Sequence, residues 1–208
     1  MLAERGGLEV AAGRGASVIA WSGPLVVGIG ASAGGLIAYE AFFAAMPADS
    51  GMAFVLVQHL DPDHESALAE ILARHTVMPV AFACDGMIPS ANTVTIIPPG
   101  TILTIHDGRL RLTRAPSVKA RRMVVDLFLV SLADDQGPNA VGIILSGFGS
   151  DGTAGIAAIK ERGGLTMCEA AFDHHAKLGM PQSAADSGFV DLVLPVEDMP
   201  AALLAYLA

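Results

Sequence analysis

Apolar and polar positions alternate along the chain in blocks whose lengths are typical of strands and helices. Short, continuous apolar runs that predict strands buried on both faces lie at residues 25–29, 52–58, 79–83, 140–146, 165–168 and 189–194. Segments that predict helices lie at residues 36–45, 66–75, 124–134, 152–162 and 199–207. Parallel neighbouring strands need crossover connections that pack back over the sheet. The order of the segments therefore predicts an α/β fold, a doubly wound, mainly parallel sheet with helices on both faces.

Residues 86–114 interrupt this order with glycines, prolines and short β-prone runs. The runs lie at residues 93–97, 102–105 and 110–113, and Asp107-Gly108 between the last two is a favourable two-residue hairpin turn. We therefore expect residues 86–114 to form a small antiparallel hairpin excursion from the parallel sheet.

A chain of 208 residues with 52% hydrophobic content is long enough for one substantial core. We expect a single domain over residues 24–208 and a flexible N-terminal extension over residues 1–23, which lack the basic-then-apolar order of a secretory signal. No apolar stretch reaches the ~18 residues of a membrane span, so membrane insertion is not expected. A net charge of -9 argues against a nucleic-acid partner.

The two cysteines, Cys84 and Cys168, are far apart in the sequence and have apolar surroundings. They form no C-x-x-C pair and no evident grouping with histidine that would hold a metal. We expect both to be buried, free thiols in a reducing cytoplasm. Neither a metal nor another cofactor is predicted.

A glycine-rich turn follows the first predicted strand, and Ser32 lies at its crest in Gly28-Ile29-Gly30-Ala31-Ser32-Ala33-Gly34-Gly35. Glycines allow a tight turn and close approach, and the start of the next helix offers unpaired N–H donors to a developing negative charge. Ser32 is therefore a candidate nucleophile. Two other interpretations stay open: Ser32 caps the helix, or the G-x-G-x-x-G/A pattern binds a dinucleotide.

Two further polar side chains come after predicted strands. His59 directly follows the strand at 52–58, and Asp151 follows the strand at 140–146 after a glycine-rich loop. Because the carboxyl ends of parallel strands lie along one edge of the sheet, both are expected near Ser32. Serine hydrolases use these residue types as nucleophile, base and orienting acid. In the alternative interpretation, His59 only bonds a loop and Asp151 only caps the helix at 152–162.

Five ordered motifs then point to one family. They are Gly28-Ile29-Gly30-Ala31-Ser32-Ala33-Gly34-Gly35, Gln58-His59-Leu60, Ile97-Pro98-Pro99-Gly100, Ser146-Gly147-Phe148-Gly149-Ser150-Asp151-Gly152 and Gly179-Met180-Pro181. The chain resembles the CheB-type protein-glutamate methylesterases of bacterial chemotaxis over about residues 25–207. Ala31-Ser32-Ala33 and Ser131-Leu132-Ala133-Asp134-Asp135-Gln136-Gly137 resemble the methylesterase domains of hybrid proteins that also carry a methyltransferase and sensory modules, and we expect the chain to be such a domain.

The resemblance implies a catalytic domain that hydrolyses glutamate methyl esters on chemoreceptors, releases methanol and can also deamidate receptor glutamines. It implies that Ser32, His59 and Asp151 are the nucleophile, the base and the orienting acid. The residues that it implies for the oxyanion or the substrate are Ala33, Phe148, Gly149, Met180, Pro181 and Gln182. Ala33, Phe148 and Gln182 stand where the family commonly has Thr, Met and Arg.

Two functions of other classes remain open on the sequence alone. A nucleotide-binding oxidoreductase would need an acidic residue at the end of the second strand, where His59 stands and Asp61 comes slightly late. A binding module could keep the fold and dock on acidic helices without catalysing a reaction on them.

Half of the basic residues gather in one short stretch of the chain. Six of the twelve lie between positions 109 and 122, where no acidic residue occurs: Arg109, Arg111, Arg114, Lys119, Arg121 and Arg122. We expect Arg109 and Arg111 to protect an exposed strand edge against aggregation. Arg121 and Arg122 are candidates for docking an acidic protein.

Overall fold

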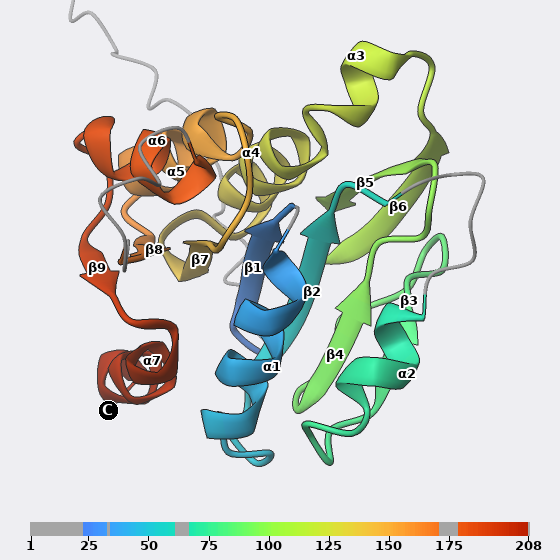
Figure 1. Ribbon diagram of the computed structural model, residues 1–208. Helices are drawn as coiled ribbons and strands as arrows, with labels where there is room; N and C mark the ends of the chain where they lie inside the picture. Colours follow the sequence, from blue (N-terminus) through green and yellow to red (C-terminus); the bar gives the residue numbers. More distant parts are fainter. Residues whose placement is uncertain (1–22, 33, 61–66, 171–178, 208) are drawn as a thin grey trace, which may run out of the picture.

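The structure, a computed structural model, describes residues 23–32, 34–60, 67–170 and 179–207, and its centre is a sheet of seven strands in the order β3-β4-β2-β1-β7-β8-β9 (Figure 1). The strands are β1 Val26–Ala31, β2 Ala53–Gln58, β3 Val80–Phe82, β4 Thr93–Ile96, β7 Ala140–Ile144, β8 Leu165–Glu169 and β9 Leu192–Leu194. Every pairing within this sheet is parallel. The predicted parallel sheet is confirmed.

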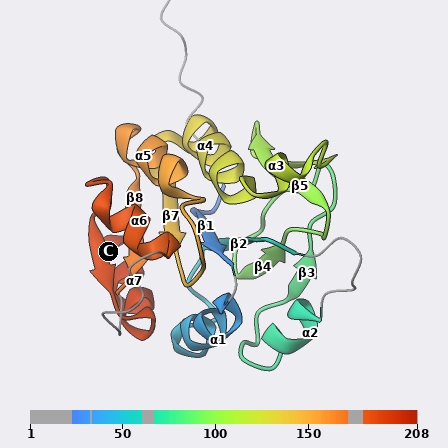
Figure 2. The same cartoon turned by 45° about the horizontal axis from the view of Figure 1, so that its top comes forward.

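Helices cover both faces of the sheet (Figures 1 and 2). One face carries α1 Gly35–Ala45, α2 Leu68–Leu72 and α7 Met199–Leu207, and the other carries α4 Val124–Gln136, α5 Thr153–Glu161 and α6 Met180–Asp186. A short helix, α3 Val118–Arg121, lies just before α4. The chain winds outward from β1 through β2 and then returns to β7, so β1 lies at the switch point where α/β sheets place their sites. No helix in the described ranges is both long and apolar enough to span a membrane.

The antiparallel excursion is smaller than the sequence predicts. It consists of β5 Thr101–His106 and β6 Arg109–Arg114, joined at Asp107 and Gly108, whose φ values of 51° and 69° fit a two-residue hairpin turn. The run at 93–97 was assigned to this excursion, but β4 pairs in parallel with β2 and β3. Both faces of β4 are covered, with Val94, Thr95 and Ile96 buried, as in other parallel sheets.

The two cysteines differ in their environments. Cys168 lies in β8, is fully buried and has its pKa raised to about 11 by that burial, so the thiol stays protonated. Cys84 is exposed, and the prediction that it is buried is wrong. It follows β3, the edge strand, where the chain leaves the sheet. The predicted extension at 1–23 lies outside the described residues except for its last position.

Glycines in β1 allow α4 to pack close to the strand. Side chains alternate along a strand, and Gly28 and Gly30 fall on the face that α4 covers. A Cβ at Gly30 would lie 2.2 Å from Cγ1 of Val125, and one at Gly28 would lie 2.7 Å from Cδ2 of Leu129. The close approach therefore requires glycine, and it brings the first turn of α4 to the carboxyl end of β1.

We expect Gly30→Ala to lower the free energy of unfolding by about 1–3 kcal/mol, because the new methyl group overlaps Val125. In a Val125→Ala background the same change should cost less, because Cγ1 is gone. Urea unfolding of the four proteins measures this coupling. Gly188→Ala is the control: its φ is 77° with no atom within 4 Å of the added Cβ, so its cost should be equal in both backgrounds. Equal costs for Gly30→Ala would contradict the contact.

Candidate active site

Ser32 follows β1 directly, and its backbone is held by hydrogen bonds on both sides. Its N–H donates to the carbonyl oxygen of Ser146 at 3.0 Å, and its own carbonyl oxygen accepts from the N–H of Gly35 at 2.9 Å. The N-cap of α1 is Gly34, with φ 88° and no side-chain cap. The interpretation of Ser32 as the cap of this helix is therefore wrong. Its hydroxyl is left to interact elsewhere.

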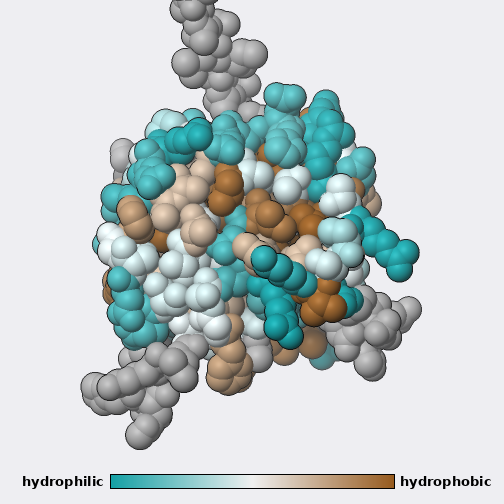
Figure 3. Space-filling model, turned by 90° about the horizontal axis from the view of Figure 1, so that it is seen from above, coloured by the Kyte–Doolittle hydropathy of each residue, from teal (hydrophilic) through white to brown (hydrophobic). Residues whose placement is uncertain are grey.

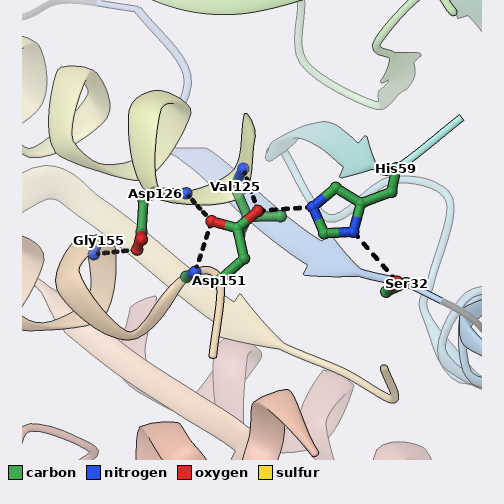
Figure 4. Close-up of polar contacts among 7 residues, drawn as sticks. Ser32, His59, Val125, Asp126, Asp151 and Gly155 are labelled. Carbon is green, nitrogen blue, oxygen red and sulfur yellow. Dashed lines mark hydrogen bonds and ion pairs between the residues drawn. The ribbon is translucent and has the colours of Figure 1, made fainter. Parts of the chain in front are cut away.

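His59 contacts this hydroxyl from the neighbouring strand. In the register of β1 and β2, Ala31 pairs with Gln58, so Ser32 and His59 are the next residues on adjacent strands. Backbones of adjacent strands lie about 4.8 Å apart. The Nδ1 atom of the imidazole lies 3.1 Å from Oγ of Ser32 (Figure 4). The pair is half-buried and within hydrogen-bond distance.

Asp151 approaches the same imidazole from the other side, after β7, which pairs with β1 on the edge opposite β2. Its Oδ2 lies 2.8 Å from Nε2 of His59. A carboxylate only accepts hydrogen bonds, so Nε2 carries the ring proton and the Nδ1 lone pair accepts from the hydroxyl of Ser32. Serine proteases use the two ring nitrogens in the opposite sense. Here Nδ1 bonds Ser32, which follows the adjacent strand β1, and Nε2 bonds Asp151, which follows β7 on the far side of β1.

The carboxylate of Asp151 also binds the first turn of α4. Oδ2 accepts from the N–H of Val125 at 3.0 Å, and Oδ1 accepts from the N–H groups of Asp126 at 2.9 Å and Gly152 at 3.0 Å. In the alternative interpretation of the sequence, Asp151 only caps the helix at 152–162, but the N-cap of α5 is Gly152 with no side-chain cap. The structure corrects this: Asp151 caps α4 while it bonds His59.

The loop between β7 and Asp151 lies directly against Ser32. A Cβ at Gly147 would lie 2.7 Å from Cβ of Ser32 and 2.9 Å from its backbone nitrogen, so glycine is required there. The loop is tied to the start of α6 by a bridge between Phe148 and Gly179 and by the Met180 N–H, which donates to the Gly147 carbonyl at 2.8 Å. Within the described ranges, no acceptor bonds the N–H of Phe148, whose side chain is 77% exposed.

Two of the other predicted substrate residues line an open groove beside this loop. Gly149 and Gln182 lie there with Thr153 and Ser183, whose hydroxyl oxygens are 2.9 Å apart. The amide of Gln182 donates to Oδ1 of Asp186 at 2.7 Å, which holds it along α6. The groove is thus lined by short polar side chains.

The remaining predicted residues do not face the groove in this way. Met180 is fully buried. A Cβ added at Gly147 would lie 2.7 Å from its sulfur, so the Met180 side chain packs beneath the loop, against Gly147. Pro181 occupies the first turn of α6, a position that suits a residue without an N–H. Ala33 lies outside the described residues.

The sequence did not indicate Val125 and Asp126, because backbone N–H donors leave no residue signature. The one available signal was an acidic side chain in the first turn of a predicted helix. Burial raises the pKa of Asp126, the N–H groups of Gly155, Gly152 and Ala154 lower it, and the charge of Asp151 raises it further. Among the described residues, no group of three or more His, Cys, Asp or Glu side chains could hold a metal ion.

Comparison with known proteins is consistent across sequence and structure. The sequence model of the CheB methylesterase family matches residues 27–203. Protein-glutamate methylesterase/protein-glutamine glutaminase 3 of Burkholderia orbicola is 36% identical over 186 residues, which are 89% of this chain and 55% of that protein. The chain thus spans about half the length of this relative. An uncharacterised 104.1 kDa protein of Rhodobacter capsulatus is 44% identical over 62% of this chain but only 13% of its own.

A solved structure agrees with these matches. The crystal structure of the Thermotoga maritima CheB methylesterase catalytic domain has a TM-score of 0.79 and 29% identity to this chain, and the match covers 89% of this chain and all of that one. The oxidoreductase interpretation is not supported, because Gly28 and Gly30 of its fingerprint serve the packing of α4. The fold, the ordered motifs and these similarities show that the chain belongs to the CheB methylesterase family.

Proposed function

We propose that this domain is a serine hydrolase that demethylates glutamate methyl esters on chemoreceptor-like proteins in the cytoplasm, with deamidation of receptor glutamines as a second reaction. The observation that carries the proposal is the unbroken chain of hydrogen bonds from Ser32 through His59 to Asp151, at 3.1 and 2.8 Å. The names of the relatives support the ester and amide substrates. Ser32, His59 and Asp151 are nucleophile, base and orienting acid in this proposal.

The first half of the reaction forms an acyl-enzyme. Oγ of Ser32 attacks the ester carbonyl carbon while its proton passes to Nδ1 of His59. The charged imidazolium is stabilised by the carboxylate of Asp151 on Nε2. His59 then returns the proton to the methoxy oxygen, the C–O bond breaks, and methanol leaves. A glutamine side chain follows the same steps with ammonia as the leaving group.

The second half restores the enzyme. Water attacks the acyl-serine carbonyl and gives a proton to Nδ1 of His59, which passes it to Oγ of Ser32 as the ester bond breaks. The glutamate carboxylate is released. Because His59 is 26% exposed in its side chain, water can reach the base without a large movement.

The negative charge that develops on the carbonyl oxygen needs donors placed in advance. We propose the backbone N–H of Phe148 as one of them. Its loop packs against Ser32 at Gly147, and within the described ranges this N–H has no other acceptor. Gly149 and Gln182, in the groove beside the loop, would then contact the flanking part of the substrate. Ala33 stays a prediction.

The substrate surface we propose lies on the side toward which the strands point. Figure 3 views this side from above and shows hydrophobic surface near its middle with hydrophilic groups around it. Val118, the first residue of α3, is 55% exposed, and Met123, between α3 and α4, is 39% exposed. Arg114 and Arg121 line a groove between the hairpin and α3. This combination suits a helix with apolar and acidic positions.

The place of this domain in a longer protein is also part of the proposal. The Rhodobacter capsulatus relative matches over only 13% of its length, so similar domains occur within much longer chains. A methyltransferase and sensory modules are the partners that we propose within such a chain.

We expect Ser32→Ala to lower the rate of methanol release from a methyl-esterified chemoreceptor fragment by about 10³-fold or more, because no other nucleophile replaces the hydroxyl. Its melting temperature should stay close to that of the unchanged protein, since Ser32 does not cap α1. Ser90→Ala changes an exposed serine ahead of β4, at the opposite end of the sheet, and as the control it should keep full activity. Normal methanol release by a folded Ser32→Ala protein would refute the nucleophile.

Asp151→Asn should lower both turnover and stability. In the protein both carboxylate oxygens of Asp151 accept from N–H donors. Asparagine has only one acceptor oxygen, and its NH₂ group, itself a donor, would face some of these donors. We expect a loss of about 1–3 kcal/mol in unfolding free energy and of about 10²-fold or more in turnover. His59→Ala should lose turnover with a smaller loss of stability, because α4 keeps its cap. An Asp151→Asn protein with normal turnover would leave Asp151 as a cap only.

Charge reversal separates the proposed docking surface from the hairpin edge. Arg121→Glu should slow association with an acidic, methylated receptor fragment on the order of tenfold at low salt, and the defect should shrink as salt rises. Arg109→Glu is the control, because Arg109 lies at the far end of the hairpin and donates to the carbonyl oxygen of Gly86. Stopped-flow mixing at two ionic strengths measures both. Equal effects of the two changes would contradict docking at α3.

A further inference from the structure

Two aspartates form reciprocal hydrogen bonds between the starts of two helices. Asp151 precedes α5, yet its carboxylate accepts from the Val125 and Asp126 N–H groups in the first turn of α4. Asp126 belongs to α4, yet its Oδ1 accepts from the Gly155 N–H in the first turn of α5 at 2.9 Å (Figure 4). We call these two residues the carboxylate pair. Each member caps the helix to which the other is attached.

Neither helix has a side-chain cap of its own. The N-cap positions are Met123 for α4 and Gly152 for α5, and neither makes a side-chain cap hydrogen bond. The first N–H groups of a helix lack partners within it, and a negative charge there is favourable. Each helix start therefore depends on a carboxylate that only the other helix supplies.

This reciprocal bonding matters for the proposed reaction because Asp151 sits on the chain that leads into α5. Any movement of the start of α5 relative to α4 moves the Asp151 backbone away from the N–H groups that hold its carboxylate. The Asp126–Gly155 hydrogen bond ties the two helix starts together, beside the close contact of Gly155 with Leu129. The carboxylate that faces Nε2 of His59 is thus positioned by two helices at once.

We propose that Asp126 is a positioning residue for the reaction proposed above: by holding the start of α5 against α4, it keeps the Asp151 carboxylate on Nε2 of His59. This inference rests on the proposed function. Asp126 does not touch His59 or the hydroxyl of Ser32; it acts through Gly155 and the first turn of α5. Its environment agrees with this role, because the half-buried side chain lies against the N–H groups of Gly152 and Ala154 as well.

Asp126→Ala removes the tie and should lower kcat by about 10- to 100-fold, the order expected for a small misplacement of a reacting group, with KM unchanged. The far-downfield proton NMR signal of the His59 Nε2–H, which reports its bond to a carboxylate, should weaken or move upfield. Asp126→Asn keeps an acceptor for the Gly155 N–H and should recover most of kcat and of the signal. If Asp126→Ala does not fold, Asp126→Ser takes its place, because its hydroxyl is too short to make the same contact.

The control is Asp134→Ala. Asp134 lies in the last turns of α4 and pairs with Arg162, at the end of α5, at 2.6 Å, so this change removes a contact between the same helices away from the site. It should leave kcat and the His59 signal unchanged. A lower melting temperature in Asp126→Ala with normal kcat and a normal His59 signal would overturn the proposal and leave only a helix cap.

The two proposals can fail separately. If the unchanged protein neither releases methanol nor reacts with a fluorophosphonate at Ser32, the proposed function fails. The His59 signal and its response to Asp126→Ala still test positioning in that case, because they need no substrate. A signal that is equal in the unchanged protein, Asp126→Ala and Asp126→Asn would overturn the positioning role.

Discussion

The carboxylate of Asp151 is the point on which the arrangement of the site depends, because its two oxygens accept from four N–H donors of different origin. Two belong to the first turn of α4, one to Gly152, and one to the ring of His59. A buried carboxylate is costly unless its lone pairs are satisfied, and Asp151 is only 8% exposed. The start of α4, the loop before α5 and the imidazole are therefore mutually constrained. None of the three can shift without leaving donors or oxygens unpaired.

Close packing makes this convergence possible. At Gly30 and Gly152 an added Cβ would lie 2.2 and 2.9 Å from the same methyl carbon of Val125, so two backbones approach one residue of α4. Without that approach the N–H groups of α4 could not reach a side chain that follows β7. The glycine pattern that in sequence also fits a dinucleotide turn thus has a structural cause. It places a helix start where the proposed chemistry needs a fixed carboxylate.

Much of the fold follows from patterns along the chain, whereas the details of the site do not. Continuous apolar runs and the order of segments predict the parallel sheet, and the Asp107-Gly108 pair predicts the hairpin turn. The membership of β4 in the main sheet was missed because a four-residue run shows no clear periodicity. Cys84 is exposed because it follows β3, the edge strand, and the strand order that puts β3 at the edge cannot be read from local sequence. That Asp151 caps α4 instead of α5 depends on packing between helices distant in sequence, and propensity carries no information on it.

The cap at the start of α4 links the position of the Asp151 carboxylate to the hydrogen exchange of backbone amides. In most helices the first amide protons exchange with solvent readily, because nothing in the helix covers them. Here the amides of Val125 and Asp126 are covered only as long as the Asp151 carboxylate stays between them and His59. Their hydrogen exchange is then governed by the same small movements that align the imidazole. Two backbone amides thereby become an internal measure of how well ordered the acid–base pair is while no substrate is bound.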